Sequence, residues 1–307
     1  MSTDSNVALV RRFVDEVING GHLDLVDEFF APDFVNHSPN FGSAPDREGL
    51  KQLLGALRAA FPDAVMRVED VVAAGDKVMI RFTSDGTQAA EFAGIPPAGR
   101  RLQARGFSLA RIADGRVVER WNVQDNLETP QSLGAVVSYP TSTEGRASEQ
   151  GTPSTIDKNK AVVRHMLEDL LNGNRPDLVG EVFSPEIQAG GVAVGLERVG
   201  QAISHHHAEF SGFQYIIDEL IGEGDTVVVR GYFRGTQTGE IRAGGLTIAP
   251  TGKPVECHVF DLYRLRDERI IEEIAMGDTL GLFQQLGFVS VQATPAEATS
   301  QPEEVPH

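Results

Sequence analysis

The sequence predicts an α+β protein made of two copies of one domain, and three observations support this prediction. The segment VINGGHLDLVDEFFAPDF (17–34) reappears as LLNGNRPDLVGEVFSPEI (170–187). The segment VVERWNVQDNLETPQSLG (117–134) reappears as IIEEIAMGDTLGLFQQLG (270–287), again 153 residues further on. Within each copy, helical periodicity comes first and strand-like alternation follows, which is typical of helices packed on an antiparallel sheet. The period matches a whole domain rather than a solenoid unit.

Three helices are expected at the start of the first copy. Apolar residues at helical spacing mark the first, and Asn19-Gly20-Gly21 supplies its end. A short second helix covers 24–30 and stops at the turn of Pro32. The third carries an apolar stripe formed by Leu50, Leu53, Leu54, Leu57 and Phe61.

The strands follow the helices. Residues 65–87 predict two strands joined at Gly75-Asp76, and 102–125 predict a hairpin that turns at Asp114-Gly115. The second copy repeats this order, with helices near 156–172, 176–184 and 195–210 and strands near 213–222, 225–237, 255–266 and 269–277. We therefore expect three helices on a curved antiparallel sheet in each copy.

Composition separates the copies. Residues 138–155 are rich in Ser, Thr, Pro and Gly, which favours a flexible linker, and 292–307 are typical of a disordered tail. The predicted domains are then 1–137 and 156–291.

Charge and composition exclude several classes of protein. A net charge of −17 repels phosphate backbones and anionic lipid surfaces, so we expect neither a nucleic-acid partner nor a membrane partner. The single cysteine, Cys257, excludes an intrachain disulfide. No secretion signal and no apolar run long enough to span a membrane is visible, so the expected location is cytoplasmic.

Several short segments carry a family resemblance. In the first copy they are Asn19-Gly20, 31–36, the loop 94–100, the strand 109–112 with its Asp114-Gly115 turn, and Asp125 followed by Leu133-Gly134. With these the sequence resembles the SnoaL-like polyketide cyclase family of the nuclear transport factor 2-like superfamily. The resemblance implies two tandem cone-shaped domains, and the second copy keeps the pattern more loosely.

The resemblance also implies a reaction. Family members close a ring in a polyketide by an intramolecular aldol condensation, without a cofactor or metal, and use an aspartate at the position of Asp125 as acid and base. Asp278 is its counterpart in the second copy. Strand alternation places each aspartate at the end of a largely apolar face, where desolvation would raise the pKa of a carboxyl group. The first of these faces comprises Val117, Glu119, Trp121, Val123 and Asp125. An aspartate just before a helix is also a good N-cap, so both roles stay open.

Two further positions differ between the copies. The family's aromatic-ring cyclases carry a histidine where this sequence has Ser108 in the first copy and Asp261 in the second. The family asparagine is matched by Asn36, and its neighbour His37 either replaces the missing imidazole or lies solvated in a loop. If Asp261 and Asp278 both face a cavity, their repulsion would create an acid/base pair, as in epoxide-opening members of the wider fold. Otherwise Asp261 faces solvent.

The remaining substrate-binding candidates are Phe61, Trp121 and His206, each of which is either cavity lining or ordinary core. Three adjacent histidines, 205–207, point about 100° apart on a helix and cannot converge on one metal. We expect an enzyme that acts on a hydrophobic small molecule by acid/base catalysis. The alternatives are an epoxide-opening cyclase or hydrolase and a non-catalytic ligand-binding or scaffold protein. The tandem copies are expected to form an intramolecular pseudo-dimer or a homo-oligomer.

Overall fold

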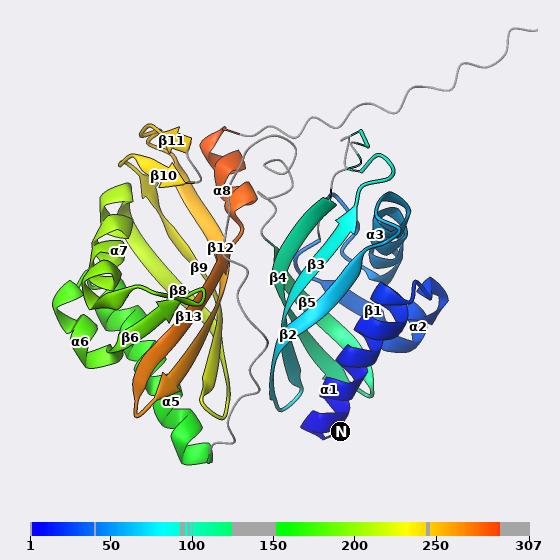
Figure 1. The fold of residues 1–307 in the computed structure, drawn as a ribbon, viewed down its shortest axis with the longest axis horizontal. Coiled ribbons are helices and arrows are strands. Elements are labelled where there is room, and N and C mark those ends of the chain that lie inside the picture. The colour runs from blue at the N-terminus through cyan, green and yellow to red at the C-terminus, as the bar shows by residue number, and fades with distance from the viewer. Residues whose placement is uncertain are drawn as a thin grey trace, which may run out of the picture.

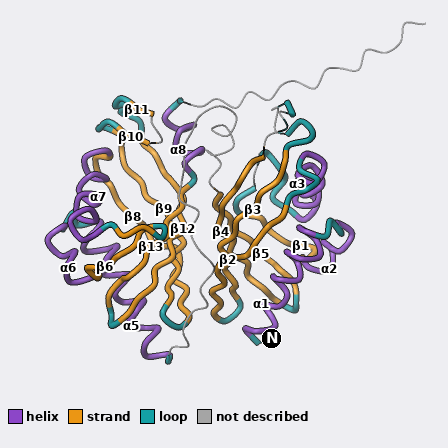
Figure 2. Tube along the Cα trace, viewed as in Figure 1, coloured by secondary structure: helices purple, strands orange, loops and turns teal. Residues whose placement is uncertain are grey.

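The computed structural model describes residues 2–39, 41–92, 96–97, 99, 101–124, 152–243 and 246–288. These residues form two domains of the same architecture, whose curved sheets face each other while most of the helices cover the outer sides (Figure 1). Figure 2 shows the same division into a central pair of sheets and two outer groups of helices. The predicted α+β class and the tandem repeat are confirmed.

The first domain contains three helices and five strands among its described residues. Helix α1 (Thr3–Arg12) starts at the N-cap Ser2, continues as a π-helical turn (Phe13–Asn19) and is followed by a 3-10 turn (Leu23–Leu25). The remaining elements are α2 (Val26–Phe29), β1 (Phe30–Asn36), α3 (Arg47–Ala60), β2 (Val65–Ala74), β3 (Lys77–Thr87), β4 (Arg101–Ala113) and β5 (Arg116–Gln124).

The second domain repeats this order. Its helices are α5 (Pro153–His165) with the π-helical turn Met166–Leu171, a 3-10 turn (Pro176–Leu178), α6 (Val179–Val182), α7 (Gly195–Glu209) and α8 (Thr279–Leu286). Its strands are β6 (Phe183–Ala189), β7 (Val192–Ala193), β8 (Phe210–Glu223), β9 (Thr226–Gln237), β10 (Ile241–Ala243), β11 (Leu246–Ile248), β12 (Pro254–Arg266) and β13 (Arg269–Gly277).

Each large sheet is mixed rather than purely antiparallel, which corrects the expectation from sequence. The strand orders are β1-β5-β4-β3-β2 and β7-β6-β13-β12-β9-β8, and β1 and β6 pair in parallel with β5 and β13. Strand β1 was not expected, because the second helix, 24–30, was predicted to stop at a turn around Pro32. A proline is tolerated here because β1 is an edge strand, where one missing N–H costs little.

A β-bulge in each last hairpin decides which side chains face inward. Arg111 pairs with Glu119 but Ile112 pairs with Val117, so Val118 is an extra residue in β5. The same shift in β13 makes Ile271 the extra residue. One extra residue turns the following side chains to the opposite face of the sheet.

The bulge corrects the single apolar face expected for β5. Val117 packs in the core of the first domain, whereas Trp121 and Val123 pack in the cluster between the two domains. Arg120 consequently faces the interior of the first domain, where it lines a cavity. In β13 the corresponding residue is Glu273, which is partly buried beside Tyr263.

The two sheets pack against each other through an apolar cluster. Its buried residues are Val72, Met79, Phe107, Leu109 and Val123 from the first domain and Ile221, Val228, Phe260 and Leu262 from the second. Phe107 stacks on Phe260, its own counterpart in the repeat, with ring centroids 6.0 Å apart. Contact between equivalent residues is the mark of a pseudo-two-fold interface, here within one chain.

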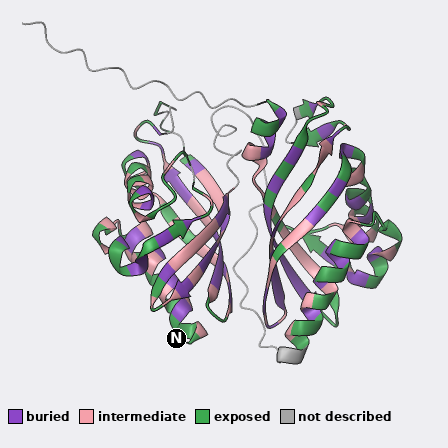
Figure 3. Cartoon of the chain, turned by 180° about the vertical axis from the view of Figure 1, so that it is seen from behind, coloured by how far each residue is buried: buried purple, intermediate pink, exposed green. Residues whose placement is uncertain are grey.

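Buried charges cross the same interface. Asp70 accepts a hydrogen bond from Arg81 at 2.5 Å and another from Arg264 of the second domain. Lys77 pairs with Glu219 of the second domain. Seen from behind, buried residues are frequent on the strands of both sheets that face each other (Figure 3). The interface is therefore apolar at its centre and held in register by ion pairs.

Candidate active site

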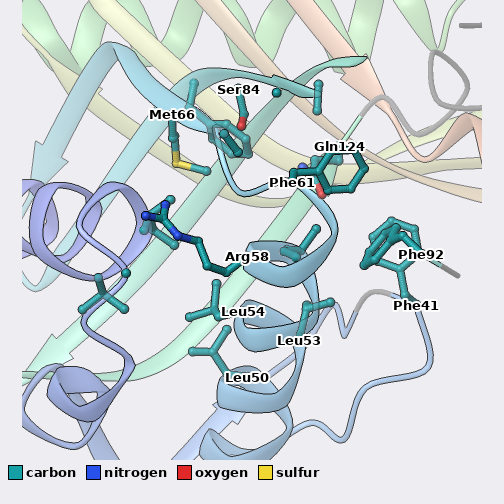
Figure 4. A pocket seen from close by; sticks show the side chains of 18 of the residues that line it. Phe41, Leu50, Leu53, Leu54, Arg58, Phe61, Met66, Ser84, Phe92 and Gln124 are labelled. Carbon is teal, nitrogen blue, oxygen red and sulfur yellow. The ribbon is translucent and has the colours of Figure 1, made fainter. Parts of the chain in front are cut away.

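A cavity of about 170 Å³ lies in the first domain between α3 and the concave face of the sheet (Figure 4). Its apolar walls include the α3 residues Leu50, Leu53, Leu54, Leu57 and the following Phe61, opposite Met66, Phe82, Phe92 and Leu102. The volume is comparable to the roughly 150 Å³ of an engineered apolar cavity that admits benzene. The apolar stripe predicted for the third helix thus lines a space that suits a hydrophobic ligand.

A few polar side chains enter this apolar cavity: Asn36, Arg58, Ser84, Gln103, Arg120 and Gln124. Asn36, at the end of β1, is only 2% exposed, and its Oδ1 accepts a hydrogen bond from the main-chain N–H of Ser38 at 3.2 Å. The structure therefore places two sequence-predicted residues, Asn36 and Phe61, at one cavity. Arg58, Ser84, Gln103, Arg120 and Gln124 were missed.

Arg120 is held by neutral oxygen atoms. Its Nε donates to Ser108 Oγ at 3.0 Å, and its Nη2 donates to Asn122 Oδ1 at 3.2 Å. Burial lowers the pKa of Arg120 to about 10. Among the residues that the structure describes, no carboxylate forms an ion pair with it. Ser108 therefore contacts the cavity indirectly, through the arginine that it orients.

His37 and Trp121 lie away from the cavity lining. The rings stack with centroids 4.5 Å apart, and His37 Nε2 is 3.7 Å from a carboxylate oxygen of Glu119. The guanidinium of Arg230, from the second domain, lies over the Trp121 ring, 4.8 Å from its centroid. The β5 bulge explains this placement, because it turns Trp121 toward the second domain.

Of the two predicted acid/base residues, the structure describes only Asp278. Asp125 lies outside the described residues, which stop at Gln124 on this strand. Asp278 is the N-cap of α8, and its Oδ1 accepts a hydrogen bond from the main-chain N–H of Gly281 at 2.9 Å. The capping alternative weighed for Asp278 is therefore present in the structure.

Asp261 points into the second domain rather than to solvent. Tyr215 donates a hydrogen bond from its hydroxyl to Asp261 Oδ2 at 2.5 Å. Burial, reinforced by the nearby Glu273, raises the pKa of Asp261 to about 7. Burial also raises the pKa of Glu273, whose Oε1 accepts from the Tyr263 hydroxyl at 3.5 Å. The carboxylate that raises the pKa of Asp261 is therefore that of Glu273. Glu273 was not predicted, because the bulge interrupts the alternation expected along β13.

Large side chains occupy the second domain where the first has small ones. Asn19 bonds the main chain of Met66, and Asn172 bonds that of Tyr215 in the same way, which makes these residues equivalent. On this correspondence the cavity-lining Ala64 and Ser84 are replaced by Phe213 and Phe233, whose rings lie 5.6 Å apart in the core. The space that forms the first cavity is thus packed with aromatic rings in the second domain.

His206 belongs to this packed interior. It stacks on Phe213 with ring centroids 5.4 Å apart, and burial lowers its pKa. Its neighbours diverge: His205 pairs with Glu209 at 3.0 Å, and His207 Nε2 lies 2.7 Å from the carbonyl oxygen of Leu171. Within the described residues no group of three or more His, Cys, Asp or Glu side chains is placed to hold a metal ion.

The sequence profile of the SnoaL-like polyketide cyclase family matches residues 8–133 and again residues 161–286. These segments cover more than half of the chain, which therefore belongs to the SnoaL-like polyketide cyclase family, once in each domain. Membership confirms the predicted family and a cyclase-like enzyme of the lyase or isomerase class.

Two relatives are cyclases from Streptomyces. The chain is 30% identical over 119 residues to the nogalonic acid methyl ester cyclase of Streptomyces nogalater, covering 38% of this chain and 88% of that protein. It is 29% identical over 140 residues to the aklanonic acid methyl ester cyclase DnrD of Streptomyces peucetius, covering 44% and 92%.

Solved structures also match single domains of the chain. IdmH of Streptomyces antibioticus is 35% identical with a TM-score of 0.38, covering 42% of this chain and 98% of that chain. TsrD of Streptomyces laurentii is 26% identical with a TM-score of 0.41, covering 44% and 99%. Across the described residues, no helix combines the length and the apolar character needed to cross a bilayer.

Proposed function

We propose that the first domain closes a ring in a hydrophobic polyketide intermediate by an intramolecular aldol-type reaction, and that the second domain supports it. The observation that carries this proposal is the apolar cavity of the first domain with its few polar groups. Sites for small molecules are characteristically concave and apolar with a small number of placed polar side chains. The two relatives are named as cyclases of nogalonic acid methyl ester and aklanonic acid methyl ester.

In the proposed reaction Asp125 acts first as a base and then as an acid. Its carboxylate removes a proton from a carbon that lies between two carbonyl groups, which leaves an enolate. The enolate carbon attacks a ketone of the same molecule, so a carbon–carbon bond forms and the ketone oxygen becomes an alkoxide. The alkoxide then takes the proton back from Asp125, which restores the carboxylate.

The repeat supports the assignment of Asp125. In the second domain the counterpart Asp278 lies beside Cys257, whose Sγ donates to the main-chain carbonyl oxygen of Asp278 at 3.6 Å. Cys257 corresponds to Ala104, which lines the cavity of the first domain. Gln124, the residue before Asp125, lines the same cavity.

The test compares Asp125→Asn with Asp278→Asn on a candidate substrate, either nogalonic acid methyl ester or aklanonic acid methyl ester. We expect at least a ~100-fold loss of kcat in Asp125→Asn, the usual scale for removing a general base. Asp278→Asn is the matched control, since asparagine is an equally good N-cap. It should keep both turnover and stability.

Two results would contradict the proposal. Undiminished turnover in a folded Asp125→Asn protein would remove Asp125 from the reaction. A comparable loss in Asp278→Asn would show that the second domain also performs catalysis. Circular dichroism and thermal unfolding of each variant distinguish a loss of chemistry from a loss of fold.

The second domain is proposed as a support rather than a second active site. Its interior is packed with aromatic side chains, and its sheet buries one face of the catalytic domain. The carboxylates Asp261 and Asp278, expected as an epoxide-opening pair, contact different groups: Tyr215 and the N-terminus of α8. If the epoxide-opening alternative held, Asp261→Ala would abolish turnover of an epoxide substrate.

A further inference from the structure

We infer that Arg120 and its neighbours form an anion-binding subsite in the first-domain cavity, which receives an oxyanion of the ligand. The ligand class is a hydrophobic, ring-bearing molecule with one oxygen that is negatively charged when bound or during the reaction. This inference rests on the proposal that the cavity is the ligand site. It adds the position and the sign of the charge that the ligand must match.

Arg120 differs in its partners from the two buried arginines, Arg81 and Arg264. Arg81 pairs with Asp70, and Arg264 pairs with both Asp70 and Glu272. Among the described residues, Arg120 instead contacts the neutral oxygens of Ser108 and Asn122 and no carboxylate. A largely desolvated cation that has no countercharge among these residues is costly, and an anion within hydrogen-bond reach offsets that cost.

A second donor lies beside the guanidinium. Asn122 is 5% exposed and uses its side-chain oxygen to accept from Arg120. The amide nitrogen of Asn122 is buried and has no hydrogen-bond acceptor among the described residues. Buried donors are normally paired, so this amide lacks an acceptor next to a cation that has no countercharge among the described residues. Arg120 lines the cavity and Asn122 does not, so a ligand oxygen with negative charge would bind the guanidinium, and Asn122 lies behind it.

The repeat provides an internal comparison. Asn36 pairs with Arg120 in the first sheet, and the equivalent pair in the second sheet is Ala189 with Glu273. Ser108, which orients Arg120, corresponds to Asp261. At these two positions the cavity-bearing domain therefore has a basic residue, Arg120, and a neutral one, Ser108. The packed domain has two acidic residues there. The anion subsite is a property of the first domain alone.

The oxyanion has two possible sources with the same chemistry. It is either a carboxylate or phenolate already present on the ligand, or the enolate oxygen that forms when a base removes a carbon-bound proton. An ionised group present at the start would use Arg120 for binding. A charge that develops later would use it to stabilise the transition state.

Arg58 is the rival cation at this cavity. It comes from α3, lines the cavity, and donates from Nη1 to the carbonyl oxygen of Asn19 at 3.2 Å. If Arg58 rather than Arg120 attracts the anion, substitution of Arg58 alone would remove the charge preference. Both arginines are therefore included in the test.

The experiment measures binding of 2-naphthoate and its neutral isostere 2-naphthamide by isothermal titration calorimetry at pH 8. We expect the wild-type protein to bind the anion at least ~10-fold more tightly than the amide, the scale of one charge-assisted hydrogen bond. Arg120→Gln should reduce this ratio to about one without weakening naphthamide binding, whereas Arg120→Lys should retain part of it. Arg116→Gln, an exposed arginine on the same strand, is the matched control and should leave the ratio unchanged.

The inference is overturned if the wild-type protein does not prefer the anion, or if Arg58→Gln rather than Arg120→Gln removes the preference. If Arg120→Gln does not fold, Ser108→Ala decides instead, because loss of its hydrogen bond should lower the ratio in a folded protein. Turnover of a neutral methyl ester distinguishes the sources of charge, because such a substrate carries no anion before the reaction. A lower kcat in Arg120→Gln indicates the enolate, and an unchanged kcat indicates that Arg120 binds an anion already present on the ligand. A normal ratio in Asp125→Asn together with lost turnover would uphold both proposals independently.

Discussion

Single buried residues distinguish the two domains. At the same position of the last strand the first domain has Arg120 and the second has Glu273. The first residue lines the cavity of the first domain, and the second accepts a hydrogen bond from Tyr263. A duplicated frame can therefore hold a ligand site in one copy and a packed interior in the other, because a few substitutions decide whether space and charge remain available.

The acidic cluster of the second domain makes stability depend on pH. Asp261 has a pKa near 4 in an unfolded chain and about 7 in the fold, so folding favours its protonated form. Its contribution to stability is fully present below pH 4 and is lost as the pH rises through 7. Glu273 shifts in the same direction, while Tyr215 and Tyr263 stay neutral across this range because burial raises the pKa of each.

Asp261→Asn should therefore raise the free energy of unfolding at pH 8 by roughly 2–4 kcal/mol, and the gain should vanish near pH 4. Urea unfolding of both proteins at several pH values measures this difference. Glu186→Gln, an exposed carboxylate on β6, serves as the control and should change little at any pH. A gain that does not depend on pH would show that Asp261 is ionised in the folded protein.

Sequence patterns identified candidate site residues more successfully than they predicted which face of the sheet each side chain occupies. Asn36 and Phe61 reach the cavity, as their positions on β1 and after α3 allow. Trp121 does not, because one extra residue at Val118 reverses the strand alternation. A bulge has no strong signature in a single sequence, so neither Arg120 nor Glu273 was found from spacing alone.

At the scale of elements, the helices and the long antiparallel strands were predictable because their periodicity is continuous. Gly75-Asp76 and Asp114-Gly115 turn the hairpins as expected, with positive φ angles at Gly75 and Asp114. The parallel-paired strands β1 and β6 were missed, since each follows a helix directly and contains a proline. Parallel pairing connects distant segments, which local patterns do not reveal.

The N-cap of α8 gives a prediction for a single element. Asp278→Ala should lower the free energy of unfolding by about 1 kcal/mol, because the N–H of Gly281 loses its acceptor. Asp278→Ser should retain most of this stability, since serine also caps well. Urea unfolding measures both variants. Equal stability of the wild-type and alanine proteins would show that the cap contributes nothing measurable.

At the scale of the whole molecule, the chain supplies both halves of an interface that two identical domains would otherwise form. Phe107 stacks on Phe260, and the ion pair from Lys77 to Glu219 also crosses the interface. The predicted intramolecular pseudo-dimer agrees with these contacts, while a homo-oligomer of whole chains and a cytoplasmic location stay predictions. Because both partners of the interface are on one chain, the second domain can pack against the first without having an open cavity of its own.

The most direct measurement is the number of 2-naphthoate molecules bound per chain, determined by isothermal titration calorimetry. We expect one, bound in the first domain, and we expect Leu54→Trp to abolish it because the indole would fill the cavity that Leu54 lines. Two molecules per chain, or one that still binds to the Leu54→Trp protein, would contradict the division into one cavity-bearing domain and one supporting domain.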